Sequence, residues 1–400
     1  MSKSLVFVLS SVFLLVLGTF ISGTILTPYA QGIGANWIQI GVLSGCMYGV
    51  RLFIGTPVGT LADRKGYLTV LKYSLALYPF IAAAYWLSAN IYFLMGARLL
   101  HGVASAMMLP ICMAYVGQAS PAGMEGRYMA LYNFAVLLAS GIGPFISVVV
   151  SDFYGDYRPT FIVLFLLSLI ALGILLFIPG QETKEKNRKK EPAGIRSDPT
   201  AGKLFKSKAL MALGFANIAM AVVASLVGFF IVPYFKSKAV NLVLIGSIVA
   251  VYNIVSGVVQ LPLGRIMDKY NKFIILILSG ILTSAALMAI PFIHSLLMIG
   301  TATAIAAVGS AAMMSAASAL SILVGRKMGM GGTMGFLSTF NSMGMIFGCL
   351  ALSLMPQIGF NFSTFFYLSG IIVIVNLILF SILWLGERNV TFAGKLFQEE

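Results

Sequence analysis

The strongest constraint on this chain is a series of twelve apolar runs, most of them separated by short polar loops. A helix needs about 20 apolar residues to cross about 30 Å of hydrocarbon, and each run reaches that length. The runs lack the alternation of polar and apolar residues that a membrane β-barrel requires. The sequence therefore predicts an all-α membrane protein with twelve transmembrane helices, at about residues 5–30, 38–62, 68–88, 91–118, 128–150, 159–179, 209–233, 240–264, 273–292, 295–323, 333–356 and 362–386.

The composition excludes a water-soluble protein. Hydrophobic residues make up 59% of the 400 residues and charged residues only 10%, which leaves too little polar surface to cover a globule in water. The formal net charge of +14 is scattered over the loops and gathers on no single face, so we expect no nucleic-acid partner. Three cysteines lie far apart inside apolar runs, which predicts neither a disulfide framework nor a thiolate metal site.

The distribution of basic residues predicts the orientation, because short loops rich in Lys and Arg stay on the cytoplasmic side. If both termini are cytoplasmic, the outer loops carry only Arg158, Lys236 and Lys238. The inner segments then hold Lys3, Arg64, Lys65, Lys72, Arg127, the cluster from Lys184 to Lys208, Arg265, Lys269, Lys272, Arg326, Lys327, Arg388 and Lys395. We therefore expect a multi-pass protein of a bacterial-type cell membrane with both termini in the cytoplasm.

One long polar stretch, residues 181–208, divides the chain into two halves with six apolar runs each. Its charge and its Pro and Gly content cannot support a packed core, so we expect a solvated cytoplasmic linker. Contact of its basic residues with anionic lipid headgroups is the alternative. The predicted domains are an N-terminal bundle over 1–180, the linker over 181–208 and a C-terminal bundle over 209–400.

An internal repeat supports this division. The loop after the second run reads GTLADRKGY and the loop after the eighth reads GRIMDKYNK. Gly59 and Asp63 thus align with Gly264 and Asp268 at a constant offset of 205 residues. The repeat predicts two pseudo-symmetric six-helix bundles. Proteins of this kind bind a small-molecule cargo near the bilayer midplane and alternate access by rocking one half against the other.

Two arginines lie inside predicted transmembrane helices: Arg51 near the middle of the second, and Arg98 in the fourth. A charge at the bilayer centre costs several kcal/mol, so each guanidinium should face the bundle interior and have a partner. All twelve acidic residues fall in loops, tails or helix ends. The sequence therefore predicts a positively charged cavity that binds an anionic or zwitterionic compound. Pairing with carbonyls and amides, or snorkelling toward an interface, are the alternatives.

Other polar residues extend the candidate cargo site. Tyr48 precedes Arg51 by one turn, and His101 follows Arg98 by three residues, so that Arg98 and His101 share a helix face and can both reach a central cavity. Polar amides inside three further runs suggest a polar cleft, although a hydrogen bond between helices is the alternative for each of them. These amides are Asn217, Asn253 and Asn341. Because His101 is the clearest membrane residue that titrates near neutral pH, it is the first candidate proton carrier, with Asp63 second. A neutral histidine packed among other side chains is the alternative for His101.

Three segments carry a family resemblance. Residues 59–66 read GTLADRKG, the fourth run contains Arg98 and Gly102, and the fifth contains Gly143 followed by Pro144. On these segments the chain resembles the major facilitator superfamily and, within it, the twelve-helix drug:proton antiporter group. The linker, the repeat and the number of runs extend the resemblance over the whole chain. The family usually has an amide where this chain has His101, and the fifth run lacks some glycines of the antiporter motif.

The resemblance implies a secondary active transporter that exports a small organic compound in exchange for protons through rocker-switch motion. It implicates Arg98 in proton coupling. The gating residues that it implies are Gly59, Asp63, Arg64, Gly264, Asp268, Gly143 and Pro144. An amphiphile or lipid flippase, a multidrug efflux pump and an uncoupled organic-anion exchanger are the alternatives. We expect a monomer that contacts membrane lipids, with no enzyme activity, cofactor or metal, because nucleotide-binding loops and HExxH or paired-cysteine spacings are absent.

Overall fold

The computed structural model describes residues 3–178, 201–238, 240, 242–354, 359 and 361–387. The first half contains α1 (Lys3–Thr24), α2 (Leu26–Gly32), α3 (Trp37–Lys65), α4 (Tyr67–Leu87), α5 (Ile91–Ala119), α6 (Glu125–Tyr154) and α7 (Pro159–Leu176). The second half contains α9 (Ala201–Lys206), α10 (Lys208–Ser225), η1 (Leu226–Phe230), α11 (Ile231–Ser237), α12 (Leu242–Lys269), α13 (Lys272–Ala289), η2 (Ile290–Phe292), α14 (Leu296–Met328), α15 (Met330–Leu354) and α16 (Phe362–Glu387).

The prediction of twelve membrane-spanning helices is confirmed, since the described residues hold twelve helical segments that are long and apolar enough to cross a bilayer. Several helices extend beyond the apolar runs that predicted them. For example, α6 covers 125–154 where the apolar run covers 128–150, and α14 continues to residue 328. An apolar run marks only the hydrocarbon crossing, whereas the helical hydrogen bonds continue into the polar interface.

The expectation that residues 181–208 lack packed structure is wrong for their C-terminal part. The short helix α9 covers 201–206, and its Leu204 is fully buried in the core of the second half. Residue 208 is already the first residue of α10. Two apolar side chains in a basic stretch, Leu204 and Phe205, pack α9 against the second bundle. The composition of the whole stretch did not indicate this contact. Residues 181–200 lie outside the described part of the chain.

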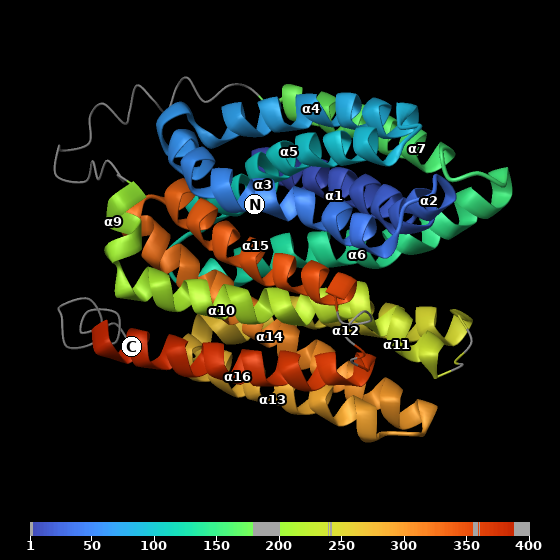
Figure 1. Ribbon diagram of the computed structural model, residues 1–400. Coiled ribbons are helices and arrows are strands. Elements are labelled where there is room, and N and C mark those ends of the chain that lie inside the picture. Colours follow the sequence, from blue (N-terminus) through green and yellow to red (C-terminus); the bar gives the residue numbers. More distant parts are fainter. Residues whose placement is uncertain are drawn as a thin grey trace.

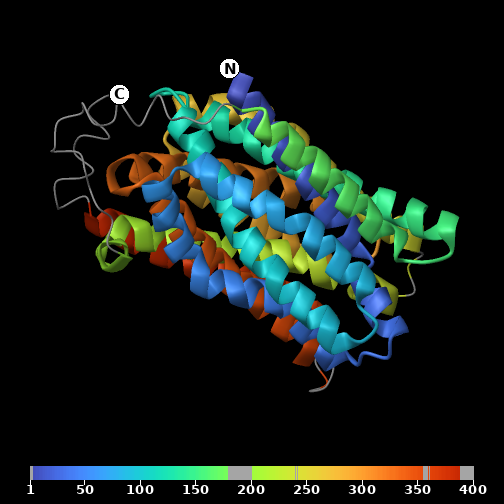
Figure 2. The same ribbon diagram turned by 90° about the horizontal axis from the view of Figure 1, so that it is seen from above.

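The helices form two bundles that lie side by side, the first in blue to green and the second in yellow to red (Figure 1). The view from above looks onto the first bundle, with the second behind it (Figure 2). Each bundle has its own apolar core. The bundles meet mainly along two helix pairs, α3 with α15 and α6 with α12. The first core also takes in Ile322, Met330 and Met334 from the second bundle, so the contact between the bundles is itself packed.

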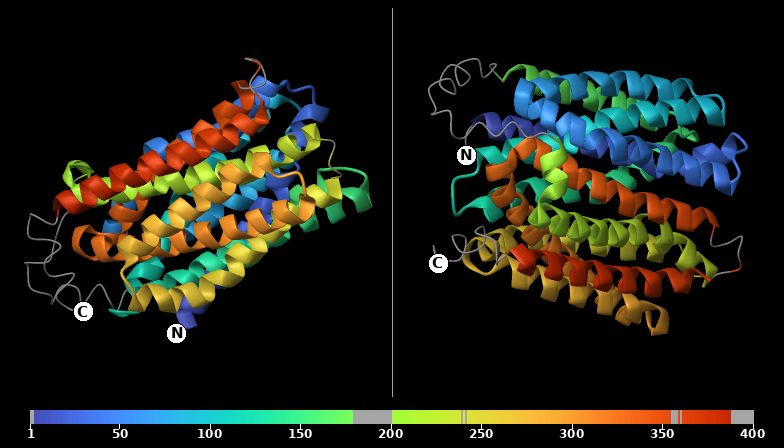
Figure 3. Two further views of the ribbon diagram at one scale, coloured as in Figure 1. Left: turned by 90° about the horizontal axis from the view of Figure 1, so that it is seen from below. Right: turned by 60° about the vertical axis from the view of Figure 1, so that its left-hand side comes forward.

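One end of the molecule carries α9, the start of α1 and the end of α16 (Figure 3, right). Arg64, Lys65, Arg326 and Lys327 lie at the same end, in the last turns of α3 and α14. We call it the basic end. A tight turn at Gly66 joins α3 to α4 there, with φ of +91°, a conformation that favours glycine. This turn fixes the end of α3, and with it Asp63, against the second bundle.

Candidate functional site

Asp63 joins the two bundles at the basic end. Its carboxylate accepts hydrogen bonds from the backbone N–H of Gly331 at 2.8 Å and of Gly332 at 2.7 Å. Both amides belong to the first turn of α15, where backbone N–H groups have no partner inside the helix and the helix dipole is positive. Asp63 also accepts a bond from the Tyr67 hydroxyl at 2.6 Å. The carboxylate therefore caps a helix of the opposite bundle.

Asp268 makes the equivalent contact on the other helix pair. Its carboxylate accepts from the backbone N–H of Gly126, in the first turn of α6, at 2.7 Å, and pairs with the Arg127 guanidinium at 3.3 Å. Gly126 and Gly331 are separated by 205 residues, the same offset that relates Asp63 to Asp268. The repeat thus includes both carboxylates and both helix starts that they cap. The two capped helix starts, at Gly126 and Gly331, could therefore have been found in the sequence from the offset of 205 residues alone.

The predicted gate glycines lie where the two bundles touch most closely. A side chain at Gly59 would overlap with the Gly331 carbonyl, and the Cβ of a side chain at Gly264 would lie 2.6 Å from the Cβ of Ala130. Gly126 leaves room for the carbonyl of Gly264, 2.5 Å from the position of a Cβ. Only a residue without a side chain permits this approach of backbone to backbone.

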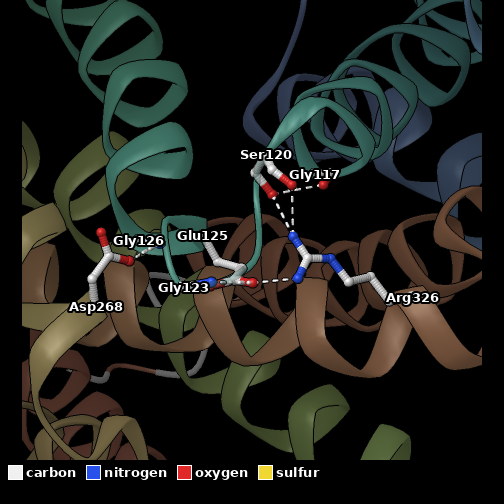
Figure 4. Close-up of polar contacts among 7 residues, drawn as sticks. All are labelled: Gly117, Ser120, Gly123, Glu125, Gly126, Asp268 and Arg326. Atoms are coloured by element: carbon white, nitrogen blue, oxygen red, sulfur yellow. Dashed lines mark hydrogen bonds and ion pairs between the residues drawn. The ribbon is translucent and has the colours of Figure 1, made fainter.

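A partly buried ion pair completes the contact and was missed by the sequence analysis. The Arg326 guanidinium at the end of α14 binds the Glu125 carboxylate at the start of α6, and donates to the carbonyl and hydroxyl oxygens of Ser120 at 2.7 and 3.1 Å (Figure 4). The Glu125 side chain is only 4% exposed. No part of the repeat predicts this pair, because its arginine has no counterpart at the offset of 205 residues.

Arg51 lies further from the basic end, at the contact between α3 and α15. It is 7% exposed, its Nη2 donates to Ser338 Oγ at 3.1 Å, and the guanidinium lies 5.7 Å from the centre of the Tyr48 ring. Its Nε has no hydrogen-bond partner among the described residues. Within the part of the chain that the structure describes, Arg51 makes no ion pair. Its neutral partners do not cancel its charge.

Arg98 and His101 form a second polar cluster, inside the first bundle. Arg98 Nη1 lies 3.4 Å from the Tyr85 hydroxyl, 3.4 Å from His101 Nδ1 and 3.7 Å from Met47 Sδ, one turn before Arg51 on α3. No ion pair of Arg98 is found among the described residues. A guanidinium only donates, so Nδ1 accepts, which places the proton of a neutral His101 on Nε2.

His101 does not reach a water-accessible cavity in this state, contrary to expectation. Its side chain is 1% exposed and lies edge-on to Tyr78 and Tyr85, with ring centres 5.4 and 5.9 Å apart. Its Nε2 has no partner among the described residues. The imidazole packs against the tyrosines of α4 inside the bundle. His101 and Arg98 do lie on one helix face, as predicted.

Two of the predicted asparagines are hydrogen-bonded within their own helices. The amides of Asn217 and Asn253 donate to the carbonyls of Leu213 at 2.9 Å and of Val249 at 3.0 Å, so they do not form the hydrogen bonds between helices that were the alternative. Asn253 does lie at the contact between bundles, where its Cβ is 3.4 Å from the position of a Cβ on Gly141. Asn341 is half-buried on α15.

Of the remaining predicted gating residues, Gly143 and Pro144 lie within the first bundle, away from the contact at the basic end, and Arg64 lies at that end. A Cβ at Gly143 would lie 2.6 Å from the Cβ of Phe20, so this glycine lets α6 approach α1 within the first bundle. Pro144 follows it inside α6. Arg64 is exposed in the last turn of α3, beside Asp63.

Comparison with known proteins agrees with this architecture. An uncharacterized MFS-type transporter of Methanocaldococcus jannaschii is 24% identical over 364 residues, which are 90% of this chain and 92% of that protein. A multi-drug resistance efflux pump PmrA homolog of Lactococcus lactis is 23% identical over 80% of each chain. The quinolone resistance protein NorA of Staphylococcus aureus is 25% identical over 48% of this chain and 50% of its own length.

The fold is shared with a solved structure, that of the human organic anion transporter MFSD10 (TETRAN). The TM-score is 0.76, at 16% identity, over 95% of this chain and 100% of that chain. The family model of the Major Facilitator Superfamily matches residues 8–243 and again residues 213–399, so each half of the repeat is covered. With twelve membrane-spanning helices in two bundles that repeat one pattern of contacts, this chain is a member of the Major Facilitator Superfamily.

Proposed function

We propose that this transporter exports a small organic compound that carries a negative group, either an anion or a zwitterion, by rocker-switch motion in exchange for protons. The observation that carries the proposal is the pair Arg51 and Arg98. Both guanidinium groups belong to membrane-spanning helices, and neither has an ion-pair partner among the described residues. An anionic group of the cargo would supply the missing counter-charge.

The contacts at the basic end support the proposed motion. Positive loops predict that this end is cytoplasmic, and we therefore propose that the structure is a state closed toward the cytoplasm. To open that side, α3 must leave α15, and the hydrogen bonds of Asp63 to Gly331 and Gly332 must break. The bond from Arg51 to Ser338 must break as well. A cargo carboxylate that binds Arg51 competes with Ser338, and so loosens the contact between the bundles when cargo is present.

The names of the relatives support the proposed direction and cargo. Two of them are described as an efflux pump and a resistance protein, which supports export. The protein with the similar fold is described as an organic anion transporter, which supports a negatively charged cargo. Multidrug efflux is the second candidate function, favoured by the relatives' names, and it predicts a broad set of cargoes in place of one.

We propose His101 as the proton carrier, and its position next to Arg98 then bears on whether cargo and proton move in opposite directions or together. A proton on Nδ1 would place a second positive charge 3.4 Å from the Arg98 guanidinium. Exchange requires that the protonated protein binds cargo more weakly. A second positive charge weakens binding of a positive group and strengthens binding of a negative one. Exchange through His101 therefore favours a zwitterion with its carboxylate at Arg51, and exchange of a purely anionic cargo would need a proton carrier other than His101.

We expect His101→Gln to separate binding from proton coupling. In liposomes, the wild-type protein should accumulate cargo against its gradient when a pH gradient is imposed. The Gln variant keeps a neutral hydrogen-bonding side chain, so it should retain cargo counterflow but lose gradient-driven accumulation. Unchanged proton dependence in the variant would reject His101 as the carrier. Accumulation of cargo on the alkaline side by the wild type would replace antiport by symport.

The contact between α3 and α15 can be tested by cross-linking to a native cysteine. The position of a Cβ on Gly45 lies 4.0 Å from the Cβ of Cys349, within the range found in disulfides. We expect Gly45→Cys to form a disulfide with Cys349 on oxidation, in a Cys46→Ala background. After cleavage at a protease site engineered within 181–200, the two halves should stay joined until reductant is added.

The same cross-link tests the proposed motion. If α3 must roll against α15 in every cycle, transport should fall at least about tenfold on oxidation and recover on reduction. The Gly45→Cys, Cys349→Ser variant serves as the control and should be insensitive to oxidant. Unchanged transport by fully cross-linked protein would contradict rocker-switch motion at this contact.

A further inference from the structure

A groove outside the contact between the bundles lies at the basic end, between α9, α10 and α16. Its volume is about 390 Å³, and its walls are apolar except for two lysines. Lys206 and Lys208 are exposed on either side of the junction between α9 and α10, while Met211, Phe215 and Leu383 belong to the apolar wall. No acidic side chain lines the groove.

The lining residues are ordered by depth in the membrane. The helix α10 begins at Lys208, and α16 ends at Glu387, so the groove occupies the first turns of α10 and the last turns of α16, at the membrane boundary. Met211 and Phe215 lie three and seven residues beyond Lys208, which corresponds to about 5 and 10 Å along the helix at a rise of about 1.5 Å per residue. Ammonium groups therefore lie at headgroup depth, and apolar side chains lie at the depth of acyl chains.

From this arrangement we propose that the groove binds one anionic phospholipid of the basic-end leaflet, with an acyl chain along Met211 and Phe215 and the phosphate between Lys206 and Lys208. Two cations above an apolar groove match a lipid with net negative charge, because the ammonium groups attract the headgroup while the wall excludes a free, hydrated anion. Phe205, beside the lysines, is 54% exposed in the groove, and an acyl chain would cover it.

The groove is connected to Asp63 through α9. The buried Leu204 packs against α15, with its Cδ1 3.4 Å from the position of a Cβ on Gly332. The Gly332 amide is one of the two that Asp63 binds. Phe205 packs edge-on against Phe336 of α15, with ring centres 4.8 Å apart. A lipid that holds α9 in place therefore stabilises the state closed at the basic end. This second step rests on the proposed gating role of that contact, whereas lipid binding does not.

Lipid binding is tested by titrating delipidated protein with phosphatidylglycerol or phosphatidylcholine and counting bound lipids by native mass spectrometry. We expect one phosphatidylglycerol to bind at least about tenfold more tightly than phosphatidylcholine. The preference should be lost in Lys206→Gln, Lys208→Gln protein. The matched control, Lys236→Gln, Lys238→Gln, removes the same charge at the opposite end and should bind like the wild type.

A second variant tests the apolar part of the groove at constant charge. Leu383→Trp should fill the groove and weaken phosphatidylglycerol binding several-fold, with the lysines intact. Equal binding of both lipids by the wild type, or full binding by the Lys206, Lys208 double variant, would overturn the proposal. Displacement of the lipid by millimolar inorganic phosphate would also overturn it, because the site would then bind free anions. These measurements need no cargo, so they stand or fall separately from the transport function.

Discussion

Gly59→Ala should lower the transport rate at least about tenfold while leaving the amount of folded protein in the membrane unchanged. An added Cβ at residue 59 overlaps with the Gly331 carbonyl, and the neighbouring atoms are backbone, which cannot move aside as a flexible side chain would. Overpacking of this kind costs about 1–3 kcal/mol. The cost falls only on the state in which the bundles meet at the basic end, so the equilibrium shifts away from it and the cycle slows.

The matched control is Gly49→Ala, on the same helix. A Cβ at residue 49 has no heavy atom within 4 Å, so transport should stay near the wild-type rate. Accessibility of an engineered cysteine at Ser120 to a membrane-impermeant thiol reagent, added from the basic end, should rise in Gly59→Ala protein. A transport rate equal to that of the wild type in the Gly59→Ala variant would show that the bundles need not approach so closely during the cycle.

The second large effect is expected at Arg51. Replacing it by Ala should weaken binding of the negative group of the cargo about 10- to 100-fold, because a hydrogen bond to a charged group contributes about 1.5–3 kcal/mol and each 1.4 kcal/mol is a factor of ten. Affinity is measured with the purified protein and a panel of small carboxylates, phosphates and sulfonates. Arg51→Lys keeps the charge but loses the planar fork, so it should recover part of the affinity.

Arg158→Ala is the control for charge alone, since Arg158 is exposed in a loop at the end opposite to the basic end. It should bind the same panel like the wild type. The Arg51→Ala variant should fold normally, because the substitution removes only one hydrogen bond to Ser338 and also removes a poorly solvated charge. If the Arg51 and Arg98 variants both kept wild-type affinity for every anion, the positive site would not be where cargo binds.

Most of the fold could be predicted from the sequence because the bilayer imposes a simple rule on it. Each crossing needs about 20 apolar residues, and the repeat at Gly59 and Gly264 then relates the two halves. Details that depend on a few contacts could not be predicted. The helix α9 forms around one buried Leu204 in a polar stretch, and helix ends extend past the apolar runs.

The candidate site, too, could be predicted from the sequence only in part. Asp63 and Asp268 were found from the repeat, but their partners are backbone amides of α15 and α6, which no side-chain pattern marks in a sequence. Only the offset of 205 residues relates two of the residues that carry these amides, Gly126 and Gly331. Glu125 and Arg326 are 201 residues apart and meet only through the packing of α6 against α14. His101 was expected in a cavity because helical spacing places it on the same helix face as Arg98. The spacing does not show that Tyr78 and Tyr85 cover the imidazole.

The most direct test of the central claim is a comparison of inside-out membrane vesicles that contain the wild-type chain with vesicles that contain the Arg51→Ala, Arg98→Ala variant. Both are exposed to a cell metabolite extract under an imposed pH gradient, and the compounds that accumulate are identified by untargeted mass spectrometry. We predict that compounds accumulated only by the wild type all carry a carboxylate, phosphate or sulfonate group. Accumulation of purely cationic or neutral compounds, or the same compounds with both proteins, would contradict a cargo site built on two guanidinium groups that have no ion-pair partner among the described residues.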